Sequence, residues 1–248
     1  SKDGKTVDWS KWHGETTELP PYDQLEPRFA ATVLYHGAQW KGHTMTNSVG
    51  GTYGQYMDYR SDTYPKGRTT TGYYLRKYLD ESHTDFSVIK VSTQTWVELR
   101  LAEIYLIRAE ANYRLGASGA ALEDVNAVRQ RPGVNLPALS GLSGNDLFKA
   151  IRQERKIELA YEGQERKIEL YCEGHRYWDM RRWKLADKEY NGYRVHGLKI
   201  TPHQGAFKFE YVDCDLQDRK FLAKTYVFPI PYDELANNSA IEQYDEWK

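Results

Sequence analysis

The sequence predicts a mainly α protein, with a tetratricopeptide-type helical scaffold, long loops and a small β element. Three observations predict this fold class. Residues 96–131 carry two helical patterns in succession, residues 1–94 are rich in Gly, Pro, Thr and Tyr without helical periodicity, and an alternating apolar pattern follows near the C-terminus. We expect a loop-rich region over 1–95 and a helical region over 96–248, with a C-terminal β hairpin and tail, both in one domain.

Residues 37–72 are the most distinctive part of the loop-rich region. Aromatic residues alternate there with Gly and small polar residues. The whole chain has 20 Tyr and 7 Trp but only 7 Phe, so most of its rings carry a polar edge that can pack and hydrogen-bond at once. A loop of this length with regularly placed rings favours a functional segment, although rings packed onto the scaffold would give the same pattern.

The first helical pattern runs from Trp96 to Gly116. Its apolar stripe is Val97, Leu101, Ile104, Tyr105, Ile107, Ala111 and Leu115. The second pattern, over 119–131, places Ala121, Leu122, Val125 and Val128 on one side and ends before Pro132. Together they predict a helical hairpin similar to one tetratricopeptide unit. A single unit cannot bury its faces alone, so further units or the rest of this chain must cover it.

A third helix is expected from Ser143 through 146–163, because Ser-Gly-Asn-Asp is a plausible capping region. Its apolar arc also contains charged side chains, namely Glu154, Arg155 and Glu158. Buried charges must be paired, so we expect an ion-pair network with downstream arginines, for which Arg176, Arg181 and Arg182 are the candidates.

The segment after Trp183 predicts a loop over 184–207 and then two short strands. The first strand, over 207–215, alternates well. The second lies over 224–235 and is interrupted by Pro229 and Pro231.

Charge and cysteine content exclude several classes of function. There are 34 Lys and Arg against 35 Asp and Glu, for a formal charge of −1, so nucleic acid is not an expected partner. Cys172 and Cys214 lack zinc-site spacing, and a disulfide between them stays open. No apolar run approaches the ~20 residues of a membrane span, and the first residues do not form the apolar core of a signal peptide.

Enzyme signatures are also missing. The histidines lack HxxxH or HExxH spacing, and neither GxSxG nor GxxxxGK[ST] occurs. Glu154 and Glu158 lie side by side on one helix, whereas a glycoside hydrolase needs two carboxylates on opposite sides of the substrate. No metal or other cofactor is expected, and no Asp-rich calcium loop is visible.

Three phrases in this order carry a family resemblance. They are WVELRLAEIYLIRAEANYRLG, then AIRQERKIELAYEG with EGHRYWDMRRW, then YVFPIPYDELANNSAIEQ. With the upstream LEPRF and TTTGYYLRKYLDE, the chain resembles the C-terminal half of the SusD/RagB family over about residues 22–243. That family consists of surface-exposed outer-membrane lipoproteins of Bacteroidetes that capture glycans, or sometimes peptides, for import.

The resemblance implies a binding protein and not an enzyme. It implies a tetratricopeptide scaffold that packs against a SusC-like TonB-dependent transporter, a loop-rich ligand face, and a location on the extracellular side of the outer membrane. It also implies an incomplete fold, with the lipid anchor and most helical repeats in an N-terminal half or second chain outside this sequence. A peptide-binding or purely scaffolding member of the same fold is the alternative function.

The ligand residues that we expect from the resemblance lie in the aromatic loop. Sugar rings stack on aromatic side chains, and their hydroxyls need polar partners. The candidate rings and polar groups are Trp40, Tyr53, Tyr56, Tyr59, Tyr64, Asn47, Asp58 and Arg60.

The phrase QERKIEL occurs twice, at 153–159 and 164–170, with a spacing of 11 residues. Eleven residues turn a helix by about 1100°, only about 20° beyond three full turns, so a helix could absorb the insert at the cost of about 16 Å in length. Gly163 also allows one copy to end its helix. An 11-residue duplication inside one motif and an error in the established sequence both account for the repeat.

Overall fold

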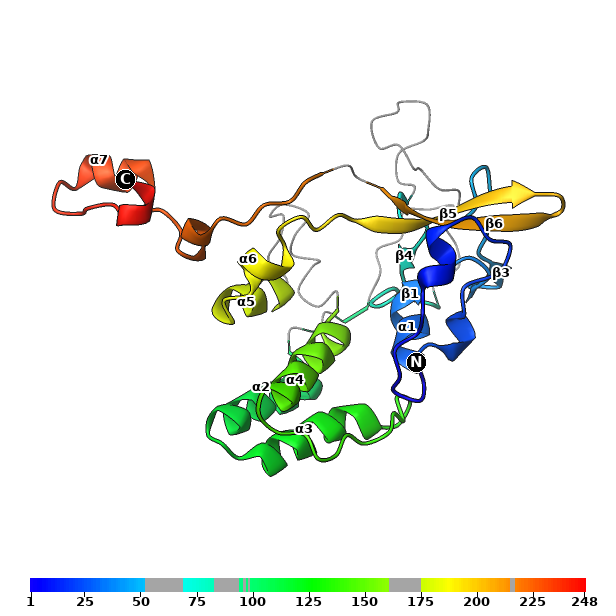
Figure 1. Cartoon of the computed structure of the whole chain (residues 1–248), viewed down its shortest axis with the longest axis horizontal. Helices are drawn as coiled ribbons and strands as arrows, with labels where there is room; N and C mark the ends of the chain where they lie inside the picture. Colours follow the sequence, from blue (N-terminus) through cyan, green and yellow to red (C-terminus); the bar gives the residue numbers. More distant parts are fainter. Residues whose placement is uncertain (52–68, 83–93, 96, 98, 161–174, 215–216) are drawn as a thin grey trace.

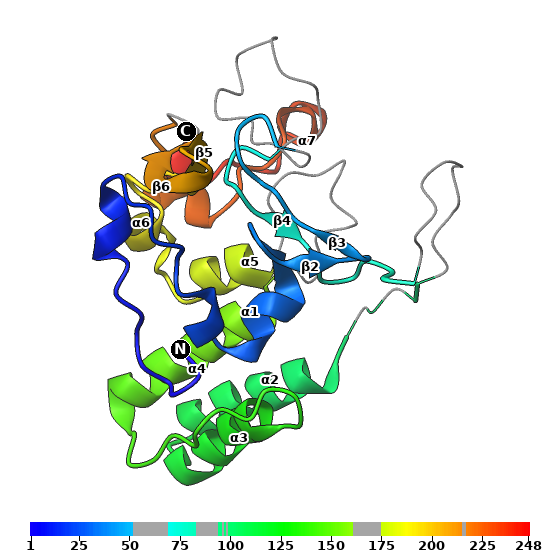
Figure 2. The same cartoon turned by 90° about the vertical axis from the view of Figure 1, so that its right-hand side faces the viewer.

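The computed structural model describes residues 1–51, 69–82, 94, 95, 97, 99–160, 175–214 and 217–248. Three helices from the middle of the chain lie together, and a long β-hairpin lies across the other end of the body (Figures 1 and 2). The α-helices are α1 Pro27–Thr32, α2 Leu101–Arg114, α3 Ser118–Gln130, α4 Gly144–Glu158, α5 His175–Arg182, α6 Ala186–Glu189 and α7 Tyr232–Asn237. The 3-10 helices are η1 Ser10–His13, η2 Tyr22–Gln24, η4 Ala223–Tyr226 and η5 Asp245–Trp247.

The described strands form three two-stranded antiparallel sheets. Their bounds are β1 Val33–Leu34, β2 Gln39–Trp40, β3 His43–Thr44, β4 Tyr74–Leu75, β5 His196–His203 and β6 Ala206–Asp213. The pairs are β1 with β4, β2 with β3, and β5 with β6. The mainly α architecture with a small β element is therefore confirmed, as expected for a helical scaffold that carries loops.

The helical core lies between α2, α3 and α4. Ala109, Ala121, Val125, Leu147 and Ile151 form one buried cluster. The alanines let the helix axes approach closely, and the larger residues of α4 fill the space between them. The predicted helical hairpin and third helix are thus present and packed on one another.

The predicted apolar stripe of α2 does not face this core. Leu101 is 69% exposed, and Ile104 and Ile107 are also exposed. The buried side of α2 instead carries Leu106 and Ala109. The helix is apolar around most of its circumference, so periodicity alone could not determine which side packs against α3 and α4.

The β-hairpin is formed by a different pair of segments from the pair that we predicted. Residues 196–203, predicted as loop, form β5 and pair along their full length with β6. The predicted second strand at 224–235 is wrong, because η4 and α7 occupy this segment. Pro229 and Pro231 lack the N–H group that a strand ladder needs, which explains why this segment does not pair.

The hairpin completes a second core with the N-terminal region. Trp12 and Tyr22 pack against Leu198, Ile200 and Phe209. The backbone of Thr16 exchanges two hydrogen bonds with Phe209, of 3.0 and 2.7 Å, so the first residues of the chain lie along β6. Residues nearly 200 positions apart in the sequence therefore form one packed unit.

Gly197 lies where β5 meets the segment before β4. The amide N–H of Leu198 donates to the carbonyl of Thr71 at 3.0 Å. A Cβ atom on Gly197 would lie 2.6 Å from the Thr71 Cα and 2.7 Å from its carbonyl oxygen. Only glycine fits this close backbone approach.

We predict that Gly197→Ala lowers the free energy of unfolding by about 1–3 kcal/mol, because backbone atoms of Thr71 must move aside. The measurement is urea denaturation followed by circular dichroism. Gly119→Ala is the matched control, since that helical position has open space around its Cβ and should be unchanged or more stable. Equal stability of the two variants would contradict the close approach.

Candidate functional site

Two buried glutamates of α4 form the charged centre of the molecule. Glu154 and Glu158 lie one turn apart, and each is only 2% exposed. Carboxylates at this depth are ionised only when cations and hydrogen-bond donors surround them. The structure supplies such partners from several elements.

Four arginines surround these two carboxylates. Arg28 of α1 donates to both glutamates, at 2.9 Å to Glu158. Glu158 also accepts from Arg100 and Arg131, each at 2.9 Å. Glu154 accepts a further hydrogen bond of 3.2 Å from Arg129.

The partners of Glu154 and Glu158 correct the sequence prediction. We expected downstream arginines near position 180, whereas the partners in the described structure come from upstream: from α1, from the start of α2 and from the end of α3. Arg28 lies in the LEPRF phrase, and the other three arginines lie at helix ends. Such positions carry no periodic signal, so the sequence analysis missed them.

A second ion-pair cluster joins α4 to α5 and α2. Arg155 of α4 donates to Asp179 at 2.9 Å. Arg182 donates to Asp179 and forms a bidentate pair with Glu110, at 2.6 Å for both contacts. Bidentate geometry is the strongest arrangement for this pair of groups. Arg155 and Arg182 thus belong to one network, although not to that of Glu154 and Glu158.

The remaining predicted arginines lie outside both clusters. Arg176 pairs with Glu189 of α6 at the surface. Arg181 lies against the ring of Phe228, with its guanidinium 4.2 Å from the ring centroid, and donates to the carbonyl of Tyr226 at 2.7 Å. These two arginines hold α5 to α6 and to the C-terminal segment.

The Glu158 carboxyl has a strongly shifted pKa. Burial by itself would raise this pKa, but hydrogen bonds and charge from Arg131 and Arg28 outweigh burial and lower it from 4.5 to about 2. The charged form is therefore the native form across the physiological range. This marks Glu158 as a structural anion and not as a proton donor.

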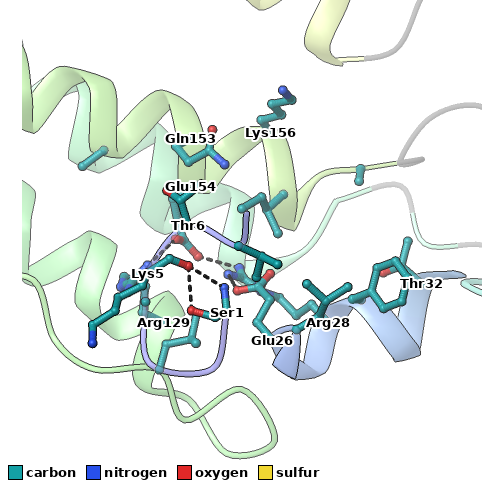
Figure 3. A pocket seen from close by; sticks show the side chains of 18 of the residues that line it. Ser1, Lys5, Thr6, Glu26, Arg28, Thr32, Arg129, Gln153, Glu154 and Lys156 are labelled. Atoms are coloured by element: carbon teal, nitrogen blue, oxygen red, sulfur yellow. Dashed lines mark hydrogen bonds and ion pairs between the residues drawn. The ribbon is translucent and has the colours of Figure 1, made fainter. Parts of the chain in front are cut away.

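A groove of about 840 Å³ opens beside this network (Figure 3). Its walls come from the first residues of the chain, from α1 and from one side of α4. Apolar groups such as Trp9, Phe29 and Ile157 line it together with Glu154 and Arg28. Figure 3 shows Glu154 between Arg28 and Arg129, so the polar groups at the base are directed at one another.

Trp40 is the candidate ligand ring that the structure describes. It ends β2, and a tight turn with positive φ at Lys41 (47°) and Gly42 (81°) places it opposite His43. The ring is half-buried, and the cationic groups of Lys41 and Arg76 lie 5.1 and 5.8 Å from its centroid. Both cations lie over the indole ring, and Arg76 also donates to Glu81 and to the carbonyl of Ala30.

Asn47 has a different environment from the one that we expected. Its side chain is fully buried, and the amide nitrogen donates to the carbonyl of Gly72 at 2.9 Å. This hydrogen bond connects Asn47 to the last residue of the aromatic segment, and the Asn47 side chain does not face solvent. We therefore leave Asn47 out of the ligand surface proposed below. The other candidates, Tyr53, Tyr56, Asp58, Tyr59, Arg60 and Tyr64, lie outside the described residues.

Within the described part of the chain, no cluster of three or more His, Cys, Asp or Glu side chains is arranged to hold a metal ion. Among the helices described, none has both the length and the apolar character needed to cross a membrane. Cys214 is buried, and Cys172, its partner in the disulfide that the sequence leaves open, lies outside the described residues.

Comparison with known proteins decides the family. The SusD family model (SusD_RagB) matches residues 1–164 and 163–247. The chain belongs to the SusD family. Proteins of this family are typically associated with the outer membrane, generally bind nutrients such as glycans, and work with SusC-like transporters.

Two relatives allow the length of this chain to be compared with that of other SusD-like proteins. A SusD-like protein P2 of Formosa agariphila is 28% identical over 155 residues, which are 60% of this chain and 25% of that protein. The crystal structure of a SusD-like protein from Bacteroides fragilis is 30% identical, with a TM-score of 0.69. The match covers 90% of this chain and 39% of that one, so the chain spans well under half of either relative.

The doubled phrase coincides with the junction of the two family matches. The first match ends at 164 and contains the first QERKIEL, and the second begins at 163 and contains the second copy. Each copy therefore falls in its own matched segment, as an 11-residue repeat inside one motif would produce. The copy at 153–159 supplies the buried Glu154, Arg155 and Glu158, and the copy at 164–170 lies outside the described residues.

We predict that Glu158→Gln lowers the free energy of unfolding by about 3–5 kcal/mol, because three arginines lose their common anion. Denaturant unfolding measures the change. Glu123→Gln is the matched control, because Glu123 is an exposed glutamate of α3 and should change stability by less than about 0.5 kcal/mol. A Glu158 variant as stable as this control would refute the role of the network.

Stability should also depend on pH through Glu158. Its folded-state pKa is depressed, so ionised Glu158 stabilises the fold above about pH 4.5, and this contribution is lost as the pH falls towards 2. We expect a loss on the order of 3 kcal/mol across this window. Unfolding at a series of pH values should show a shallower acid dependence for Glu158→Gln than for the unaltered protein. Parallel curves would count against this assignment.

Proposed function

We propose that this chain is part of a surface glycan-binding protein that delivers oligosaccharides to a SusC-like TonB-dependent transporter. In this proposal the protein is held by a lipid anchor on the extracellular face of the outer membrane and has no catalytic activity. Family membership is the observation that carries the proposal, since SusD proteins generally bind glycans and work with such transporters.

Trp40 supports the sugar-binding part of the proposal. The half-buried indole can stack on one face of a sugar, and the Lys41 ammonium near the ring can donate to the sugar hydroxyls. The Tyr-rich sequence 52–68 begins eight residues after β3 ends, and Tyr53, Tyr56, Tyr59 and Tyr64 remain its proposed ligand rings, with Asp58 and Arg60 as polar partners.

We predict that Trp40→Ala weakens polysaccharide binding about tenfold, which corresponds to about 1.4 kcal/mol. The assay is native electrophoresis in gels that contain soluble starch, β-1,3-glucan or xylan, with Tyr56→Ala tested in parallel. Trp247→Ala is the matched control, because it removes a tryptophan from η5 at the C-terminal end of the chain (Figure 1). No release of reducing ends is expected during the assay.

The same assay distinguishes glycan binding from the alternative function. A peptide-binding or scaffolding member of the fold would migrate unchanged in every polysaccharide gel and would retain components of a peptide mixture or its transporter partner. Unchanged migration of the unaltered protein in all gels would overturn the glycan proposal.

A further inference from the structure

A second group of exposed aromatic side chains lies at the open end of the β5–β6 hairpin. Tyr193 is 52% exposed and Tyr211 is 39% exposed. The His196 ring stacks on Tyr211, with ring centroids 4.9 Å apart and an interplanar angle of 7°. This surface, composed of Tyr193, His196 and Tyr211, was not among the sites expected from the sequence.

The hairpin register holds these rings in place. His196 lies opposite Asp213, and its Nε2 lies 2.7 Å from the Asp213 carboxylate. Tyr211 lies opposite Leu198, which is buried in the hairpin core. The rings of His196 and Tyr211 are therefore held by the hairpin, so little of their side-chain freedom remains to be lost when a ligand binds.

Among the described residues, the charges around the rings cancel. Arg194 pairs with Asp213 at 3.3 Å and with Asp218 at 2.6 Å, and the guanidinium of Arg219 lies 5.9 Å from the centroid of Tyr193. Two arginines and two aspartates sum to zero when His196 is neutral. Such a surface offers hydrogen-bond donors and acceptors without a net field, which suits a neutral polyhydroxylated ligand better than an ion.

Backbone contacts place this surface beside the residues that precede β4. The described chain resumes at Thr69 after the Tyr-rich sequence, and two residues later Thr71 accepts the N–H of Leu198 at 3.0 Å. Gly197, next to His196, lies directly against the Thr71 backbone. The start of β5 and the residues before β4 are thus fixed side by side.

We propose that Tyr193, His196 and Tyr211, with Arg194 and Asp213, form a second binding surface for a neutral oligosaccharide. A sugar ring stacks its C–H face on Tyr193 or Tyr211, and the paired charged groups bind its hydroxyls. This inference rests on the proposed function and extends it from the Trp40 region to the hairpin.

The test uses the same affinity gels with soluble starch, β-1,3-glucan and xylan as neutral probes and alginate as the anionic probe. Tyr193→Ala and Tyr211→Ala should each weaken binding of the neutral polymer that retards the unaltered protein by about fivefold to tenfold. Tyr211→Phe keeps the stack on His196 and should retain most of the affinity. Tyr232→Ala is the matched control, since Tyr232 is 81% exposed and lies on α7, away from the hairpin (Figure 1).

The outcomes separate this inference from the proposed function. If Tyr193→Ala and Tyr211→Ala bind neutral polymers as the unaltered protein does, while Trp40→Ala does not, the second surface is refuted and glycan binding stands. If the unaltered protein is retarded in no gel, both proposals fail. Tyrosine-dependent binding of alginate alone, or of a peptide mixture alone, would overturn the ligand class. Should Tyr211→Ala not fold, Tyr193→Ala alone decides the test, because its half-exposed side chain contributes little to the core.

Discussion

The rest of the structure depends on burial of the two α4 carboxylates among arginines. Arg28 reaches them from α1, Arg100 from the start of α2, and Arg129 and Arg131 from the end of α3. A carboxylate buried without partners is far more costly than one that is fully paired, so the network disfavours any packing in which one segment is absent.

The same helix also fixes the loop-rich region to the scaffold. The Lys77 ammonium, two residues after β4, donates to the carbonyl oxygens of Glu158 and Ala160, both at 3.0 Å. Cations are favourable at the C-terminal end of a helix, where carbonyl groups lack helical partners. The candidate ligand face is thus connected through β4 to the ion-pair network, although the two lie in different parts of the sequence.

This arrangement separates the charged groups that hold the fold from the groups that we propose to bind ligand. Glu154, Glu158 and their arginines are directed at one another, whereas Tyr193 and Tyr211 are exposed and Trp40 is half-buried. The charged phrase that dominates the sequence is therefore structural. The aromatic side chains that we propose to bind ligand take no part in these ion pairs.

The sequence by itself determined the family, the three central helices and the presence of charges on the core side of α4, because these depend on local phrases and on helical periodicity. Only the tertiary structure decided which arginines pair with Glu154 and Glu158, which side of α2 is buried, and that residues 196–203 form a strand. It also placed Asn47 in the interior. Each of these depends on segments distant in sequence, and the partner of a buried charge, an apolar side or a strand edge cannot be read from the residues next to it.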